Sequence, residues 1–176
     1  MNGKIKFIEL EFNSAMYPLM SRVEDASGFD VKAINIKQIW NNQNRKLERS
    51  ETEKLNKVFQ DKGELYLKSS SRTLIGIGLK FDLPDGIHCL VHNRSSVPLK
   101  QGLIIGNSPG VIDTDYRGEV GIILINTSDL PVIIKRGQRI AQLIFEEKSN
   151  FHLIRVEEFD THTSLRGEKG FGSSGI

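Results

Sequence analysis

The sequence has one cysteine, no long apolar run and almost no net charge, and each scarcity excludes a class of protein. Cys89 alone cannot form an internal disulfide or a cysteine-based zinc site, so a secreted disulfide scaffold is excluded and a cytoplasmic setting is the default. No run approaches the roughly 18 apolar residues of a membrane span. The 24 basic and 22 acidic residues leave a net charge of +2, which provides no broad field for nucleic acid. We expect a soluble protein that binds neither membranes nor nucleic acid.

Histidine is also scarce, and the pattern of the rest of the chain is that of a β protein. The four histidines show none of the usual metal-ligand spacings, so no protein-ligated metal is predicted. Alternating apolar residues predict short strands at residues 4–12, 73–83, 87–92, 103–105, 118–126, 130–134 and 140–145. Turns rich in Gly, Pro and Asp separate them, which indicates an all-β sandwich or barrel.

One segment has helical rather than strand periodicity. Residues 44–60 are rich in Glu, Lys, Arg and Leu, and their apolar residues Leu47, Leu55, Val58 and Phe59 recur near helical spacing. We expect a surface helix inserted into the β domain. Its charges are typical of a solvated face, and the alternative is a docking surface for a partner protein.

Three polar segments could carry chemistry. Residues 110–119 place Asp113 after an apolar pair, where a partly desolvated carboxylate can act as a general base; the alternative is a turn capped by its own Asp residues. Arg94-Ser95-Ser96 suits phosphate oxygens, or is an ordinary helix start with a serine cap. Residues 166–175 combine glycines with Arg166 and Phe171, which suits a phosphate-binding loop with a stacking face, or a flexible tail.

Taken in chain order, these three segments and two others resemble the five motifs of the trimeric dUTPase (deoxyuridine triphosphatase) family. The counterparts are residues 26–31, 94–96, 110–119, 137–143 and 166–175. The resemblance implies a distorted, jelly-roll-like β-barrel in a homotrimer whose active sites are shared between subunits. It implies a single domain over residues 1–163 with an insertion at about 36–65, and a Gly-rich lid over 164–176. Gln138 departs from the family pattern, because an acid is common there.

The activity that the resemblance implies is hydrolysis of dUTP to dUMP and pyrophosphate, which keeps uracil out of DNA and supplies dUMP for dTMP synthesis. Asp113 would activate the attacking water, Tyr116 would pack under the deoxyribose and exclude a 2′-hydroxyl, and Mg²⁺ would travel on the triphosphate with one of its waters oriented by Asp30. The residues expected to bind the phosphates are Arg94, Ser95, Ser96 and Gln142. The uracil pocket would be a hairpin built by Asn107, Gly110, Val111, Ile112 and the backbone at Gly121.

The lid would come from a third subunit and order when nucleotide binds. Its substrate-binding residues would be Arg166, Phe171, Gly172, Ser173 and Ser174. Two alternatives remain at this stage. The first is a dCTP deaminase, a relative that is expected to need a glutamate in the strand ending near Asn126, where the sequence has none. The second is an interaction protein gated by dUTP, in which the inserted helix contacts a partner.

Overall fold

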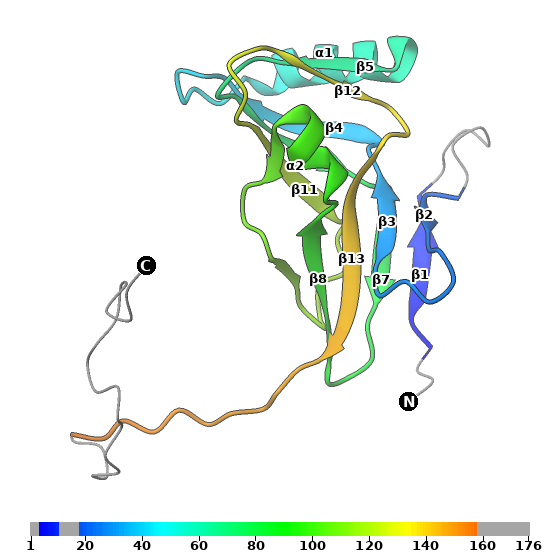
Figure 1. Cartoon of the computed structure of the whole chain (residues 1–176), viewed down its shortest axis with the longest axis vertical. Coiled ribbons are helices and arrows are strands. Elements are labelled where there is room, and N and C mark those ends of the chain that lie inside the picture. The colour runs from blue at the N-terminus through cyan, green and yellow to red at the C-terminus, as the bar shows by residue number, and fades with distance from the viewer. Residues whose placement is uncertain (1–3, 11–17, 158–176) are drawn as a thin grey trace.

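The computed structural model describes residues 4–10 and 18–157, and most of their regular structure is β-strand (Figure 1). The elements are β1 (Lys6–Glu9), β2 (Met20–Ser21), β3 (Phe29–Lys32), β4 (Asn35–Trp40), α1 (Arg49–Lys62), β5 (Glu64–Leu67), β6 (Arg72–Gly76), β7 (Leu79–Asp82), β8 (Ile87–Asn93), α2 (Ser96–Gln101), β9 (Leu103–Ile105), β10 (Gly110–Ile112), β11 (Gly121–Asn126), β12 (Val132–Lys135) and β13 (Arg139–Glu147).

Two larger antiparallel sheets enclose one apolar core. The first has the order β10-β8-β13-β3-β2 and the second β4-β6-β11-β9, while β1 pairs with β7 and β12 with β5. Alternate residues of the central strands point inward, as Ile122 and Leu124 do in β11 and Cys89 and Val91 do in β8. These residues belong to a single buried cluster. The predicted jelly-roll-like β fold is confirmed, with separate sheets rather than one closed ladder.

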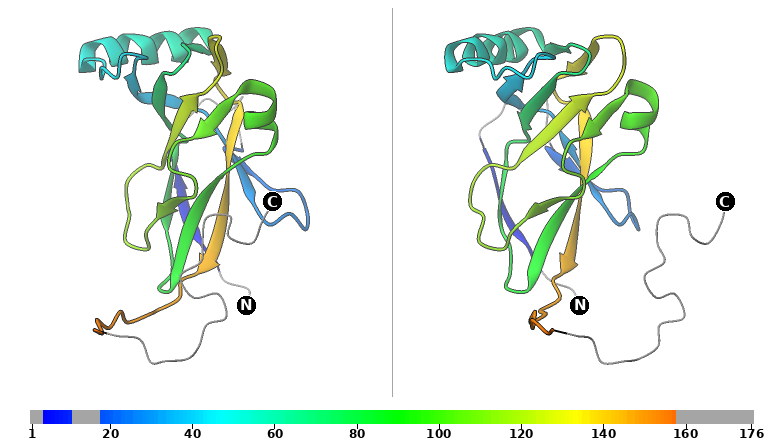
Figure 2. Two further views of the ribbon diagram at one scale, coloured as in Figure 1. Left: turned by 60° about the vertical axis from the view of Figure 1, so that its left-hand side comes forward. Right: turned by 90° about the vertical axis from the view of Figure 1, so that its left-hand side faces the viewer.

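The inserted helix is confirmed, but it starts later than residue 44 and ends later than residue 60. Before it, Asn44 has a positive φ of 60° and Lys46 bridges back to Trp40, so the chain first makes a reversal. The helix ends at Gly63, whose φ of 76° is the left-handed conformation that favours glycine. Figure 2 shows α1 lying across one end of the sheets. It is more than a solvated surface helix, because Phe59 is completely buried against the body.

The strand expected over residues 73–83 is broken in two, and the halves belong to different sheets. The break lies at Gly78, whose φ is 71° and whose N–H donates to the Glu119 carboxylate at 2.9 Å. Similarly, the strand expected from residue 118 starts only at Gly121, because the preceding residues form a turn. The sequence did not predict β2, β3, β4, β5 or β10; β4 is interrupted by a bulge, and the other four have only two to four residues each.

At the opposite end from α1, the chain leaves the body after β13. Residues 148–157 run away from the sheets (Figure 1), and Phe151, Leu153 and Ile154 are at least 80% exposed. Among the helices of residues 4–10 and 18–157, none is long and apolar enough to cross a membrane.

Candidate active site

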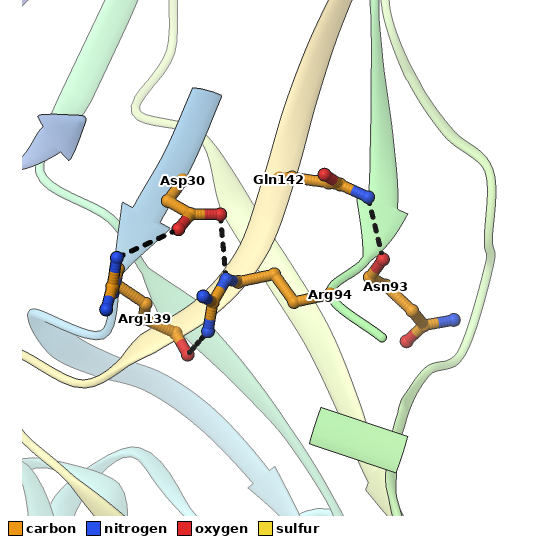
Figure 3. A network of polar contacts seen from close by, with 5 residues as sticks. All are labelled: Asp30, Asn93, Arg94, Arg139 and Gln142. Carbon is orange, nitrogen blue, oxygen red and sulfur yellow. Dashed lines mark hydrogen bonds and ion pairs between the residues drawn. The ribbon is translucent and has the colours of Figure 1, made fainter. Parts of the chain in front are cut away.

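Strand β13 brings together side chains from three of the sequence motifs. It lies between β3 and β8, and the register sets Gln142 beside Asp30 on one side and His92 on the other. Arg94 follows the end of β8, so its side chain reaches back across the sheet toward Asp30 (Figure 3). Residues that are 112 positions apart in the sequence are therefore neighbours in the fold.

Two guanidinium groups share the Asp30 carboxylate (Figure 3). Arg94 Nε donates to Asp30 Oδ1 at 2.7 Å, and Arg139 Nη1 lies 3.3 Å from Asp30 Oδ2. Arg94 Nη1 also donates to the Arg139 carbonyl at 3.4 Å. The three side chains together carry one net positive charge. Because the carboxylate aims the planar fork of Arg94 while the cluster stays positive, the arrangement is suited to binding phosphate oxygens.

The cluster borders a cavity of about 430 Å³, which Gly28, Asp30, Arg139 and Gln142 help to line. The amide of Gln142 donates to the Asn93 carbonyl at 3.0 Å. A Cβ at Gly28 would lie 2.8 Å from Gln142 Oε1, so the absence of a side chain there leaves room for the amide. Sequence reasoning missed Asn93 and Arg139, although both adjoin or lie within the quoted motifs.

The two serines of the second motif begin α2. Ser95 stands at the N-cap position without a side-chain capping hydrogen bond, and Ser96 is the first helical residue. The interpretation of this segment as a helix start is therefore correct, while the serine cap expected with it is not formed. Both serines directly follow Arg94 in the sequence.

Gln138, which differs from the family pattern in the fourth motif, makes hydrogen bonds to two neutral amide groups in place of an ion pair. Its Nε2 donates to Gln101 Oε1 at 2.8 Å, and its Oε1 accepts the Lys135 N–H at 2.9 Å. The first contact ties the end of α2 to the turn before β13. Gln138 thus supports the segment that carries Ser95 and Ser96.

A second, smaller cavity of about 150 Å³ gathers the third motif. It is lined by Val111, Ile112, Asp113, Tyr116, Val120 and Gly121. All but Val120 are residues that the sequence singled out. Asp113 is exposed in the single chain, so the expected partial desolvation is not provided by its own subunit.

The turn around Tyr116 is held by one local contact and one contact to β8. Tyr116 Oη donates to the Glu119 carbonyl at 3.0 Å, and Thr114 Oγ1 donates to the Ile87 carbonyl at 2.7 Å. A Cβ at Gly118 would lie 2.5 Å from Tyr116 Oη, so only glycine leaves this space for the phenol. Tyr116 remains 45% exposed.

The segment expected to form a uracil-binding hairpin reverses direction without pairing its own strands. β9 pairs with β11, and β10 pairs with β8. Asn107 lies in the connecting turn, where a Cβ at Gly110 would approach its Nδ2 to 3.2 Å. Asn107 therefore sits against Gly110, in a turn that passes from one sheet to the other.

The two groups of site residues lie at opposite ends of β8. Asp113 directly follows β10, whose last pair is Ile112 with Cys89, whereas Arg94 follows the other end of β8. Asp113 therefore lies at the level of His88, and the six residue steps from His88 to Arg94 span about 20 Å of extended strand. One chain therefore does not bring Asp113 next to Arg94. The lid residues Arg166, Phe171, Gly172, Ser173 and Ser174 lie outside the described residues.

Comparison with known proteins decides the family. The sequence profile of the dUTPase family matches residues 61–175, which is 115 of the 176 residues. The chain belongs to the dUTPase family. A curated dUTPase, the deoxyuridine 5′-triphosphate nucleotidohydrolase of Helicobacter hepaticus, is 44% identical over 110 residues, or 62% of this chain and 68% of that one. The corresponding enzyme of Corynebacterium jeikeium is 47% identical over 110 residues, covering 60% and 69%.

Solved dUTPase structures share the fold over more of the chain than the profile matches. The dUTPase of Staphylococcus bacteriophage 80alpha, solved with dUPNHPP, covers 99% of this chain and 100% of its own with a TM-score of 0.71 at 24% identity. The dUTPase of phage phi11 of S. aureus, which has a species-specific insert, covers 90% and 99% with a TM-score of 0.64 at 19% identity. The shared fold therefore includes the strands before residue 61.

Proposed function

We propose that this protein hydrolyses dUTP to dUMP and pyrophosphate at sites shared between the chains of a homotrimer. The observation that carries the proposal is the grouping of motif residues into two incomplete half-sites. One half-site has the cationic cluster of Asp30, Arg94 and Arg139 beside Gln142, which suits a triphosphate. The other has Asp113 and Tyr116 beside a small cavity, which suits a nucleoside. Both contact the same nucleotide if they come from different subunits.

The segment that follows β13 supports the same assembly. Residues 148–157 carry apolar side chains away from the body and precede the proposed lid, so a neighbouring copy of the chain is a suitable surface to cover them. In the assembled site the lid over residues 164–176 would close on the nucleotide, with Phe171 over uracil.

The chemistry assigned to the chain is general base catalysis at phosphorus. The Asp113 carboxylate takes a proton from a water molecule, whose oxygen attacks the α-phosphorus in line. The bond from that phosphorus to its bridging oxygen breaks, and pyrophosphate leaves. Tyr116 packs under the deoxyribose, while Arg94 and the serines of α2 hold phosphate oxygens. Product dUMP would serve dTMP synthesis and the removal of dUTP would keep uracil out of DNA.

Mg²⁺ fits this site as an ion that the triphosphate carries. Within residues 4–10 and 18–157, no three His, Cys, Asp or Glu side chains come close enough to hold a metal. Mg²⁺ is commonly bound by one or two carboxylates together with substrate phosphates and waters. Asp30 would orient one such water, and the ion would neutralise charge on the phosphate oxygens.

A nucleotide panel tests the activity. The protein is incubated with Mg²⁺ and dUTP, dCTP, dTTP or UTP, and pyrophosphate and ammonia are followed. We expect pyrophosphate from dUTP alone, and a loss of turnover of roughly 100-fold or more in Asp113→Asn. Asp115→Asn is the matched control, because it removes an exposed carboxylate from the same turn. Ammonia from dCTP would instead support a deaminase, which the acid-free strand β11 disfavours.

A complementation experiment tests the shared site. Asp113→Asn and Arg94→Ala chains are each inactive alone, and they are mixed after denaturation and refolded together. If the half-sites come from different subunits of a threefold ring, random mixing restores about a quarter of the wild-type activity. If one chain supplied both residues, mixing would restore none. Docking of a partner protein on the outer face of α1 stays a prediction.

A further inference from the structure

The carboxylate of Glu119 is the most heavily bonded acidic group near the Tyr116 turn. Its Oε1 accepts the Gly78 N–H at 2.9 Å and the Asn35 amide at 2.9 Å, and its Oε2 lies 2.6 Å from Lys37 Nζ. The side chain is only 12% exposed. Three donors from two separate segments therefore fix one carboxylate that no step of the proposed chemistry uses.

The main chain at the same position holds the sugar-binding tyrosine. The Glu119 carbonyl accepts the Tyr116 hydroxyl at 3.0 Å. The next residue, Val120, lines the small cavity and is bonded on both sides: its N–H donates to the Leu79 carbonyl at 2.9 Å, and its carbonyl accepts the Ile77 N–H at 3.1 Å. The position of the phenol therefore depends on where Glu119 is held.

Strand β4 is shaped to present Asn35 and Lys37 to the Glu119 carboxylate. Its register against β6 shifts between Ile36 and Gln38, so Lys37 is the extra residue of a β-bulge. The bulge allows Ile36 and Ile39 both to be buried while Asn35 and Lys37 point to the carboxylate. Gly76 pairs with Asn35, and a Cβ there would run into both Glu119 Oε1 and the Asn35 amide.

We propose that Asn35 and Lys37 are positioning residues which, through Glu119, fix Tyr116 and so set the preference for deoxyribose over ribose. The inference rests on the proposed hydrolysis of dUTP. A phenol held against its own turn leaves a fixed space under the sugar, and a looser phenol can move to admit a 2′-hydroxyl. Both residues precede the profile match and lie outside all five sequence motifs.

The test compares dUTP with UTP in variants that keep the shape of the side chain. Lys37→Met retains the stem and removes the charge, and Glu119→Gln retains one acceptor. Lys46→Met is the matched control, because it removes an exposed lysine next to the end of the same strand. For each protein, kcat/KM is measured with both nucleotides, and thermal unfolding is recorded.

We expect the ratio of kcat/KM for dUTP to that for UTP to fall roughly tenfold in Lys37→Met and in Glu119→Gln, and to stay at the wild-type value in Lys46→Met. A purely structural role would lower the melting temperature and leave this ratio unchanged, and that result in either variant would overturn the inference. The same comparison is made by calorimetry with the non-hydrolysable imido analogues of dUTP and UTP. If the wild type fails to hydrolyse dUTP, the proposed function fails. The ratio of the calorimetric affinities for the two analogues still decides the role of Lys37 and Glu119.

Discussion

Truncating Phe59 should show how far the inserted helix is part of the folded core. Phe59 is completely buried on α1, and two hydrogen bonds accompany it: Asn56 Oδ1 accepts the Ile36 N–H at 2.7 Å, and Gln60 Nε2 donates to the Ile34 carbonyl at 2.9 Å. Replacing a buried Phe by Ala typically costs about 3–5 kcal/mol of unfolding free energy, because apolar burial is lost and a cavity remains. Alanine returns about 0.5 kcal/mol through its higher helix propensity. The net expected loss is about 2.5–4.5 kcal/mol.

The measurement is urea unfolding followed by circular dichroism. At about 2–4 °C per kcal/mol for a chain of this size, Phe59→Ala should also lower the melting temperature by roughly 5–18 °C. Val58→Ala, at a neighbouring helix position that is 42% exposed, should change stability by about 0.5 kcal/mol or less. Each variant is measured at several protein concentrations, because the stability of an oligomer depends on concentration. A loss below about 1 kcal/mol in Phe59→Ala, equal to that of Val58→Ala, would refute the packing argument.

Two further predictions concern the charge and burial of single groups. Burial raises the pKa of the Cys89 thiol to about 12, so from about pH 9 upward only the unfolded chain ionises and stability falls by about 1.4 kcal/mol per pH unit. Urea unfolding at pH 8 and pH 10.5 should show the wild type losing about 2 kcal/mol more than Cys89→Ala, and equal losses would contradict the raised pKa. Asp30→Asn should raise the KM for dUTP about tenfold or more, because the Arg94 fork loses the carboxylate that aims it. Steady-state kinetics check this, and an unchanged KM would mean that Arg94 is aimed without Asp30.

The strands that were predicted well are those with one buried face. β8, β9 and β13 lie close to their expected ranges, since alternate burial leaves a period-two pattern that can be read locally. β4 could not be found in this way, because its bulge places two buried residues three positions apart. The break between β6 and β7 was also hidden, because the pattern continues through Gly78 while the partner strands change.

The residues of the candidate site also divide into those that the sequence predicts and those that it does not. The order of local motifs predicts Asp113, Tyr116 and Arg94 as site residues, and it includes five of the six residues around the small cavity. It does not predict Arg139, Asn93 and Glu119, because their contacts join segments far apart in the sequence. In the sequence, Glu119 is only the last residue of the 110–119 motif. Its contacts with Asn35 and Lys37 join positions more than 80 residues apart.

The sequence by itself determined the family, the β class and the candidate site residues, because these depend on local composition and on the order of short motifs. Only the tertiary structure decided which residues meet. The central place of β13 brings Asp30, Arg94 and Gln142 together, and the length of β8 keeps Asp113 apart from them. Strand pairing over long sequence separations, which is set by packing of the whole core, is the physical reason for both.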